Sequence, residues 1–179
     1  MVFSSPIRLW LLPSAVLLGT LAIWGTLRYP HLPDRIPKHI GIDGVDAWTN
    51  RSIGSAFMLV FVYAGVTALV TACAELTLRV TPRAELPGGG ATPFAGGLVP
   101  PSALKRPASR TSARRTARAL LLLNACVGIS LLVGCGTLWR SAPEQEVPGL
   151  LFAAMIVPIL VGTALTVGVT VRDRKEATH

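Results

Sequence analysis

Hydrophobic and polar positions alternate along the chain in long blocks. Four apolar runs with almost no charge, each of 19 or more residues, cover about 9–27, 53–78, 119–139 and 148–171. At about 1.5 Å per residue, 19 helical residues span roughly 28 Å, close to the roughly 30 Å hydrocarbon core of a bilayer. The pattern predicts an all-α membrane protein with four transmembrane helices, with the lipid bilayer as its first partner. The first run exceeds the core of a signal peptide, so we expect it to remain as an anchor.

The basic residues are distributed unevenly over the polar blocks. Of the 17 Lys and Arg residues, 12 lie near the N-terminus, in the segment 79–118 or in the C-terminal tail, and five lie in the other two loops. Basic residues collect on the cytoplasmic side of membrane helices. We therefore predict a multi-pass plasma-membrane protein with both termini in the cytoplasm, and a structured extracellular loop at 28–52 between the first two helices.

The net charge of +8 is therefore consistent with a membrane topology signal and does not by itself indicate nucleic-acid binding. The basic residues between 105 and 118 abut the third apolar run, and no aromatic residues interleave with them. Such a segment indicates contact with anionic lipid headgroups, and we expect no nucleic-acid partner.

The blocks divide the chain into three segments. Residues 1–78 comprise the first helix, the outer loop and the second helix. Residues 79–118 are rich in Pro, Gly and basic residues, which predicts a disordered cytoplasmic linker. Residues 119–179 form a helical hairpin of the third and fourth helices with a cytoplasmic tail. Trp139 is expected to mark the outer membrane interface, and Pro158, near the middle of the fourth run, predicts a kink.

One acidic residue, Glu75, and one asparagine, Asn124, lie within the apolar runs. Ionisable groups inside a membrane are costly. Glu75 is therefore either a proton or cation site, or a carboxylate near the headgroups paired with Arg79 at i+4. Asn124 is predicted at a similar depth if the second and third helices are antiparallel neighbours. A hydrogen bond between Glu75 and Asn124 is our hypothesis for this pair.

The outer loop has an unusual composition. Prolines at 30, 33 and 37 exclude one continuous helix and favour a stiff, turned path. Trp48 is expected at the outer membrane interface, and residues 49–50 are candidate N-caps of the second helix. We predict a compact, hairpin-like cap against the outer ends of the helices.

Four potential metal ligands, His31, Asp34, His39 and Asp43, fall within 13 residues of this loop. One interpretation is a metal site, and the other is a hydrogen-bond network among His39, Asp43, Asp46 and backbone amides. No helical spacing typical of zinc enzymes supports the metal. We therefore expect no metal, no other cofactor, no catalytic residue and no enzymatic activity.

The residue order of this loop is similar to a family signature. Leu-Pro-x-x-Ile-Pro-x-His, then Gly, then Asp-x-Trp and a basic residue, here Arg51, resembles the bacterial membrane family called domain of unknown function 1648, over about residues 14–60. The loop departs from the family pattern in two places: the family usually has an aromatic residue followed by Asn or Asp where this chain has Ile40-Gly41, and often Pro where it has Val45. The same domain occurs in immunity proteins against a sporulation killing peptide, so the resemblance implies peptide immunity.

The function that we expect is non-enzymatic. The outer loop would act in immunity to a membrane-active peptide or in envelope-stress sensing, with a toxin peptide or another membrane protein as its partner. Its candidate binding residues are Pro33, Asp34, Pro37, His39, Asp43, Asp46, Trp48 and Arg51. The alternative is a small transporter or channel-like subunit that uses Glu75, Asn124 and the helix kinked at Pro158.

Overall fold

The computed structural model describes residues 5–41, 44–85, 106–139 and 149–176. Its long helices are α1 (Ser5–Arg28), α3 (Met58–Arg79), α5 (Arg110–Leu138) and α6 (Gly149–Glu176). All four are long and apolar enough to cross a membrane. The predicted four-helix membrane fold is confirmed, and the chain is a multi-pass membrane protein.

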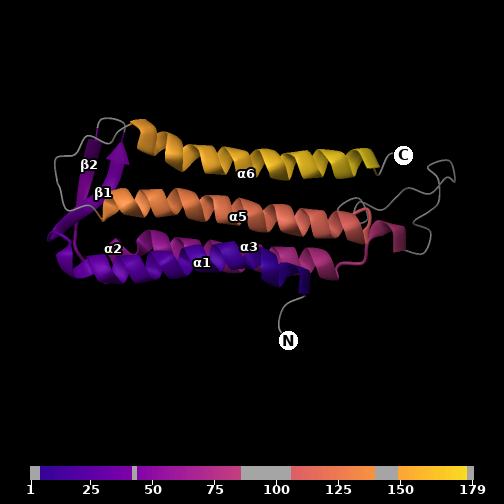
Figure 1. The fold of residues 1–179 in the computed structure, drawn as a ribbon, viewed down its shortest axis with the longest axis horizontal. Helices are drawn as coiled ribbons and strands as arrows, with labels where there is room; N and C mark the ends of the chain where they lie inside the picture. The colour runs from indigo at the N-terminus through magenta and orange to yellow at the C-terminus, as the bar shows by residue number, and fades with distance from the viewer. Residues whose placement is uncertain (1–4, 42–43, 86–105, 140–148, 177–179) are drawn as a thin grey trace.

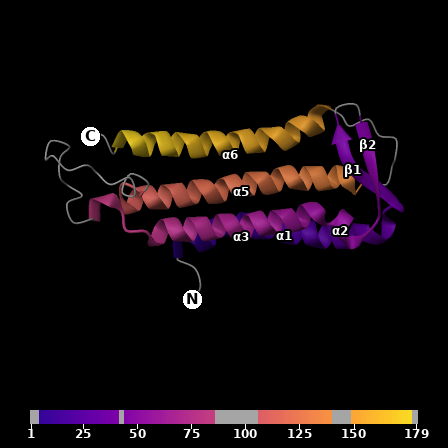
Figure 2. The ribbon, with the colours of Figure 1, turned by 180° about the vertical axis from the view of Figure 1, so that it is seen from behind.

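Helix α5 lies at the centre of the bundle. It packs against α1 and α3 on one side and against α6 on the other, so α6 forms the outer layer in both ribbon views (Figures 1 and 2). A Cβ atom at Gly162 would lie 3.2 Å from Cα of Leu123 and 3.1 Å from Cβ of Cys126. The missing side chain at Gly162 therefore allows the backbones of α5 and α6 to approach closely.

The short elements lie at the two ends of this bundle. The turn η1 (Tyr29–His31), an antiparallel hairpin of β1 (Arg35–Gly41) and β2 (Gly44–Asn50), and the single turn α2 (Ile53–Ala56) connect α1 to α3. We call this the hairpin end; η2 (Arg83–Glu85) lies at the opposite end with the beginning of α1 (Figure 1), which we call the linker end.

The buried interior has three layers along the bundle axis. The hairpin-end core contains Leu21, Tyr63, Cys135 and Trp139 together with residues of the hairpin. The linker-end core consists of Ile7, Ala74, Ala117 and Leu121. Between them lie the polar side chains of Ser14 and Asn124, both fully buried.

The start of the third long helix differs from the sequence-based expectation. α5 begins at Arg110 rather than near 119, because Ser109 caps it: the Ser109 hydroxyl accepts a hydrogen bond from the backbone N–H of Ser112 at 3.1 Å. The segment 110–118 is therefore helical and not part of a linker. Residues 86–105 of the predicted linker lie outside the described residues.

α6 is one continuous helix that includes Pro158, and the kink at this residue stays a prediction. The predicted environment of one other residue differs. Trp139, expected to mark the membrane interface, is 1% exposed, and its indole N–H donates to the carbonyl of Ala56 at 3.0 Å. Its ring therefore stabilises the protein interior rather than contacting lipid headgroups.

Candidate functional site

The hairpin lies on the helix ends through two apolar side chains. Leu32, just after η1, and Ile36, in β1, are both buried. They belong to the hairpin-end core, in which Ala56, Val60 and Trp139 are also buried. Burying two aliphatic side chains of this size is worth roughly 3–6 kcal/mol in total, so the hairpin is held as a packed cap and not as a tether.

Arg51 closes the base of the hairpin. Its backbone N–H donates to the carbonyl of Asp34 at 2.7 Å, and its Nη1 donates to the carbonyl of Leu32 at 2.5 Å. The guanidinium also lies 3.5 Å from the Asp34 carboxylate and 5.8 Å from the centroid of the Tyr29 ring. Arg51 thus joins the strand leaving the hairpin to the chain entering it.

Two serines cap the N-terminus of the next helix, α2. The Ser52 hydroxyl accepts from the Ser55 N–H at 3.1 Å, and the Ser55 hydroxyl accepts from the Ser52 N–H at 3.0 Å, forming a reciprocal capping box. The cap is therefore Ser52, and the expectation of a cap at residues 49–50 is wrong. Both of those residues still belong to β2.

The strand register shows how the predicted site residues are arranged. Pro37 is opposite Trp48, and His39 is opposite Ala47. The register shifts on both sides of His39, which leaves Asp46 without a directly opposite residue. Such bulges increase local twist and redirect side chains. The hairpin therefore brings the backbones of His39 and Asp46 next to each other, while Asp43 lies outside the described residues.

The exposed side of the cap contains several of the predicted binding residues. Trp48 is 40% exposed, and the Asp34 side chain is 98% exposed. Pro33, Pro37 and Arg51 are half-buried. The described residues contain no group of three or more His, Cys, Asp or Glu side chains that could hold a metal ion; because Asp43 is not among them, the four-ligand set stays a prediction.

The clasp formed by Arg51 gives a direct test of the cap. We expect Arg51→Ala to raise the rate of hydrogen exchange at Leu32 and Ile36, because it removes a charged hydrogen bond and a cation–π contact, together worth about 2 kcal/mol. Asp34→Ala is the matched control, since exposed ion pairs contribute about 0–1 kcal/mol. Equal exchange rates in the two variants would contradict a clasp based on the backbone of Leu32.

Asn124 lies in the polar layer between α1, α3 and α5. Its side-chain Nδ2 donates to the hydroxyl oxygens of Ser14 at 2.9 Å and Thr67 at 3.0 Å. The Tyr63 hydroxyl donates to the Asn124 backbone carbonyl at 3.3 Å. One amide thus connects three helices at one depth, which favours a role in fixing their relative positions.

The hypothesis of a Glu75–Asn124 hydrogen bond is wrong. Nδ2 of Asn124 donates to Ser14 and Thr67, and its Oδ1 has no hydrogen-bond partner among the described residues. The Glu75 carboxylate accepts from Nε of Arg79 at 3.0 Å, the i+4 pairing that was the other interpretation. Asn124 lies level with Thr67, two turns from Glu75, so the polar residues that motivated a transport function do not form one cluster.

Several partner residues gave no signal in the sequence. Ser14, Tyr63 and Thr67 are ordinary members of apolar runs, and nothing in their spacing identifies them as partners of Asn124. Tyr29 could have been predicted as a cation–π partner of Arg51, because an aromatic residue and a basic residue in the same loop commonly form such a pair. The others depend on how α1 and α3 pack against α5.

The segment that carries the cap matches a known family. Residues 15–63 match the model for the domain of unknown function DUF1648. The chain carries a DUF1648 domain. The resemblance inferred from the order of prolines, His39 and Trp48 is therefore confirmed. No curated protein and no solved structure matches the chain significantly.

The DUF1648 match includes most of α1, the hairpin, α2 and the first turns of α3. The core beneath its hairpin also contains Cys135 and Trp139, which belong to α5 and its C-cap. The DUF1648 domain of this protein is therefore completed by a helix from outside the matched segment.

Proposed function

We propose that the protein is a non-enzymatic plasma-membrane protein whose hairpin cap binds a membrane-active peptide outside the cell and so protects the membrane. Envelope-stress sensing through the same surface is the other version of this proposal. The predicted orientation, with both termini in the cytoplasm, places the cap on the outer surface. The observation that carries the proposal is the exposure of Trp48 on a cap whose apolar residues Leu32 and Ile36 are buried.

Rigidity supports a binding role for the cap. Leu32 and Ile36 anchor its underside, and Arg51 joins its two ends. A surface held in one conformation loses little conformational entropy when a partner binds. A rigid cap is therefore suited to recognition, whereas a flexible loop of the same sequence would first have to become ordered.

The chemistry of the exposed face also supports peptide binding. Trp48 offers a large aromatic surface, and Asp34 and Arg35 are exposed on the same cap. Exposed tryptophans surrounded by polar residues are among the side chains that most often dominate affinity at protein interfaces. An amphipathic peptide has the matching apolar and charged groups.

The test is protection of a peptide-sensitive bacterial host that expresses the protein. The host is challenged with a panel of cationic amphipathic peptides and pore-forming bacteriocins. We expect wild-type expression to raise the lethal concentration of at least one peptide severalfold. Trp48→Ala should abolish this protection at equal membrane abundance, and His39→Ala and Asp46→Ala should reduce it.

The control separates binding from folding. Trp48→Phe keeps an aromatic surface and should retain most of the protection, while the thermal stability of all variants in detergent should match that of the wild type. Unchanged survival for the wild type against the whole panel would overturn the immunity version. Full protection by Trp48→Ala would overturn the role of the exposed face.

A further inference from the structure

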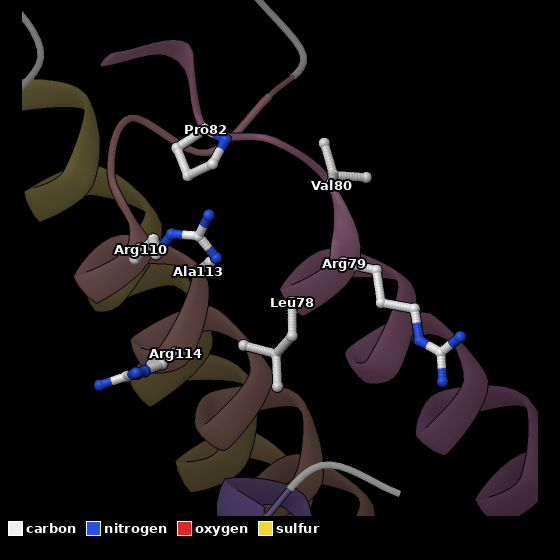
Figure 3. A pocket seen from close by; sticks show the side chains of 7 residues that line it. All are labelled: Leu78, Arg79, Val80, Pro82, Arg110, Ala113 and Arg114. Carbon is white, nitrogen blue, oxygen red and sulfur yellow. The ribbon is translucent and has the colours of Figure 1, made fainter. Parts of the chain in front are cut away.

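A cavity of about 200 Å³ opens at the linker end, between the end of α3 and the beginning of α5. Its apolar walls are Leu78, Val80, Pro82 and Ala113. Three arginines, Arg79, Arg110 and Arg114, also line it. Figure 3 shows the Arg110 guanidinium between the two helices, whereas those of Arg79 and Arg114 extend outward from their helices, away from this space. The cavity combines an apolar interior with a basic rim.

Helix length places this cavity at the depth of lipid headgroups. α5 has 29 residues, which at about 1.5 Å per residue exceeds a hydrocarbon core of about 30 Å by two to three turns. Its first turns, which contain Arg110 and Arg114, are the polar part of the helix. α3 ends at Arg79 on the same side. The arginines therefore lie where phosphate groups of lipids are found.

Of the three arginines that line the cavity, one has no ion pair within the part of the chain that the structure describes. Arg79 is paired with Glu75 at 3.0 Å, and two nitrogens of Arg110 each lie 2.7 Å from an oxygen of Glu85. This double hydrogen bond holds the pKa of Glu85 below its usual range, so its carboxylate is charged at neutral pH. For Arg114 the described residues supply no hydrogen bond or ion pair, and its side chain is exposed.

The neighbouring basic residues of α5 have other partners. Arg115 lies 3.9 Å from Asp173 of α6, and the Arg118 guanidinium lies 5.6 Å from the centroid of the Trp10 ring. Both partners are on helices other than α3, and neither arginine lines the cavity. Among the described residues of these first turns, Arg114 and Arg118 have no carboxylate partner, and of the two only Arg114 lines the cavity.

We propose that this cavity binds one anionic phospholipid. The exposed edge of Arg110 donates hydrogen bonds to the lipid phosphate, and the exposed Arg114 side chain turns from its outward position in Figure 3 to donate to the same group. The glycerol and upper acyl carbons lie against Leu78 and Val80. Basic pockets between transmembrane helices suit such headgroups, because one site satisfies both charge and apolar contact. With the predicted orientation, the lipid belongs to the cytoplasmic leaflet.

The experiment measures lipid binding to the purified full-length protein in a neutral detergent. Short-chain phosphatidylglycerol, short-chain phosphatidylcholine and inorganic phosphate are titrated separately, with thermal unfolding and native mass spectrometry as readouts. We expect phosphatidylglycerol alone to raise the melting temperature and to be retained as one lipid per protein. Arg114→Gln should raise the half-saturating concentration about fivefold.

Two further variants make the result specific. Arg172→Gln removes a charge at the same end of the bundle from α6 and should leave the titration unchanged. Val80→Glu introduces a negative charge at the cavity wall and should weaken phosphatidylglycerol binding at least as much as Arg114→Gln. An equal response to phosphatidylcholine or inorganic phosphate, or equal effects of Arg114→Gln and Arg172→Gln, would overturn the proposal.

Discussion

Trp139→Ala should be the most destabilising single substitution at the hairpin end. The side chain is 1% exposed, and its ring meets Trp24 edge-on at a centroid distance of 5.3 Å and Phe57 at 6.0 Å. Truncating a buried tryptophan to alanine costs about 3–5 kcal/mol through lost contacts and the cavity left behind. The Ala56 carbonyl would also lose its indole donor.

The measurement is the free energy of unfolding from titration with a denaturing detergent, with tryptophan fluorescence or circular dichroism as the signal. Trp48→Ala is the matched control, because it removes the same side chain from the exposed face of the cap and should cost less than about 1 kcal/mol. Trp139→Phe should fall between the two, since it keeps a ring but loses the hydrogen bond. Equal losses for Trp139→Ala and Trp48→Ala would contradict the buried position of Trp139.

These two tryptophans also show which parts of the molecule the sequence can predict. The helices follow from long uncharged runs, because a membrane requires about 20 apolar residues whatever the neighbouring segments do. Both tryptophans lie next to such a run, and the tendency of tryptophan to occupy membrane interfaces predicted the same place for both. Only packing distinguishes them: Trp139 fits beside Gly25, where a Cβ would lie 2.7 Å from its ring.

The cap was predictable in outline but not in its secondary structure. Three prolines excluded a helix, and the turn residues indicated a chain that folds back. They did not indicate strands, because Pro37 cannot donate to a sheet ladder and normally argues against a strand interior. The structure places Pro37 in a two-stranded hairpin, in which either strand is an edge strand, and proline is tolerated there.

The error over Glu75 and Asn124 has a simple geometric cause. Depth was judged from the distance of each residue to the predicted end of its apolar run. α5 begins at Arg110, nine residues before the predicted run, so its polar first turns lie beside η2 and the end of α3. The resulting register places Asn124 next to Thr67 and not next to Glu75. A capped basic extension of a transmembrane helix has no apolar signal that would reveal it.

Gly128→Ala should cause the second large loss of stability, at the contact of α1, α3 and α5. A Cβ atom there would lie 2.5 Å from Cζ of Tyr63 and 2.9 Å from Cδ1 of Leu17, and closer still to the Tyr63 hydroxyl. Tyr63 is fully buried, and its hydroxyl is bound to the carbonyl of Asn124. Because the ring is rigid, buried and hydrogen-bonded, we expect the helices to separate to admit the Cβ atom, at a cost of about 1–3 kcal/mol or more.

A double-mutant cycle tests this cause directly. Gly168→Ala is the control, since a Cβ atom at that position meets nothing within 4 Å, and alanine there should be neutral or stabilising by up to about 1 kcal/mol. Tyr63→Leu removes the ring and lowers stability by itself. In that background Gly128→Ala should cost much less, because the atoms of the Tyr63 ring are absent and only the flexible end of Leu17 has to shift. If Gly128→Ala were as harmful in the Tyr63→Leu variant as in the wild type, the contact between α3 and α5 would not be the reason for glycine at this position.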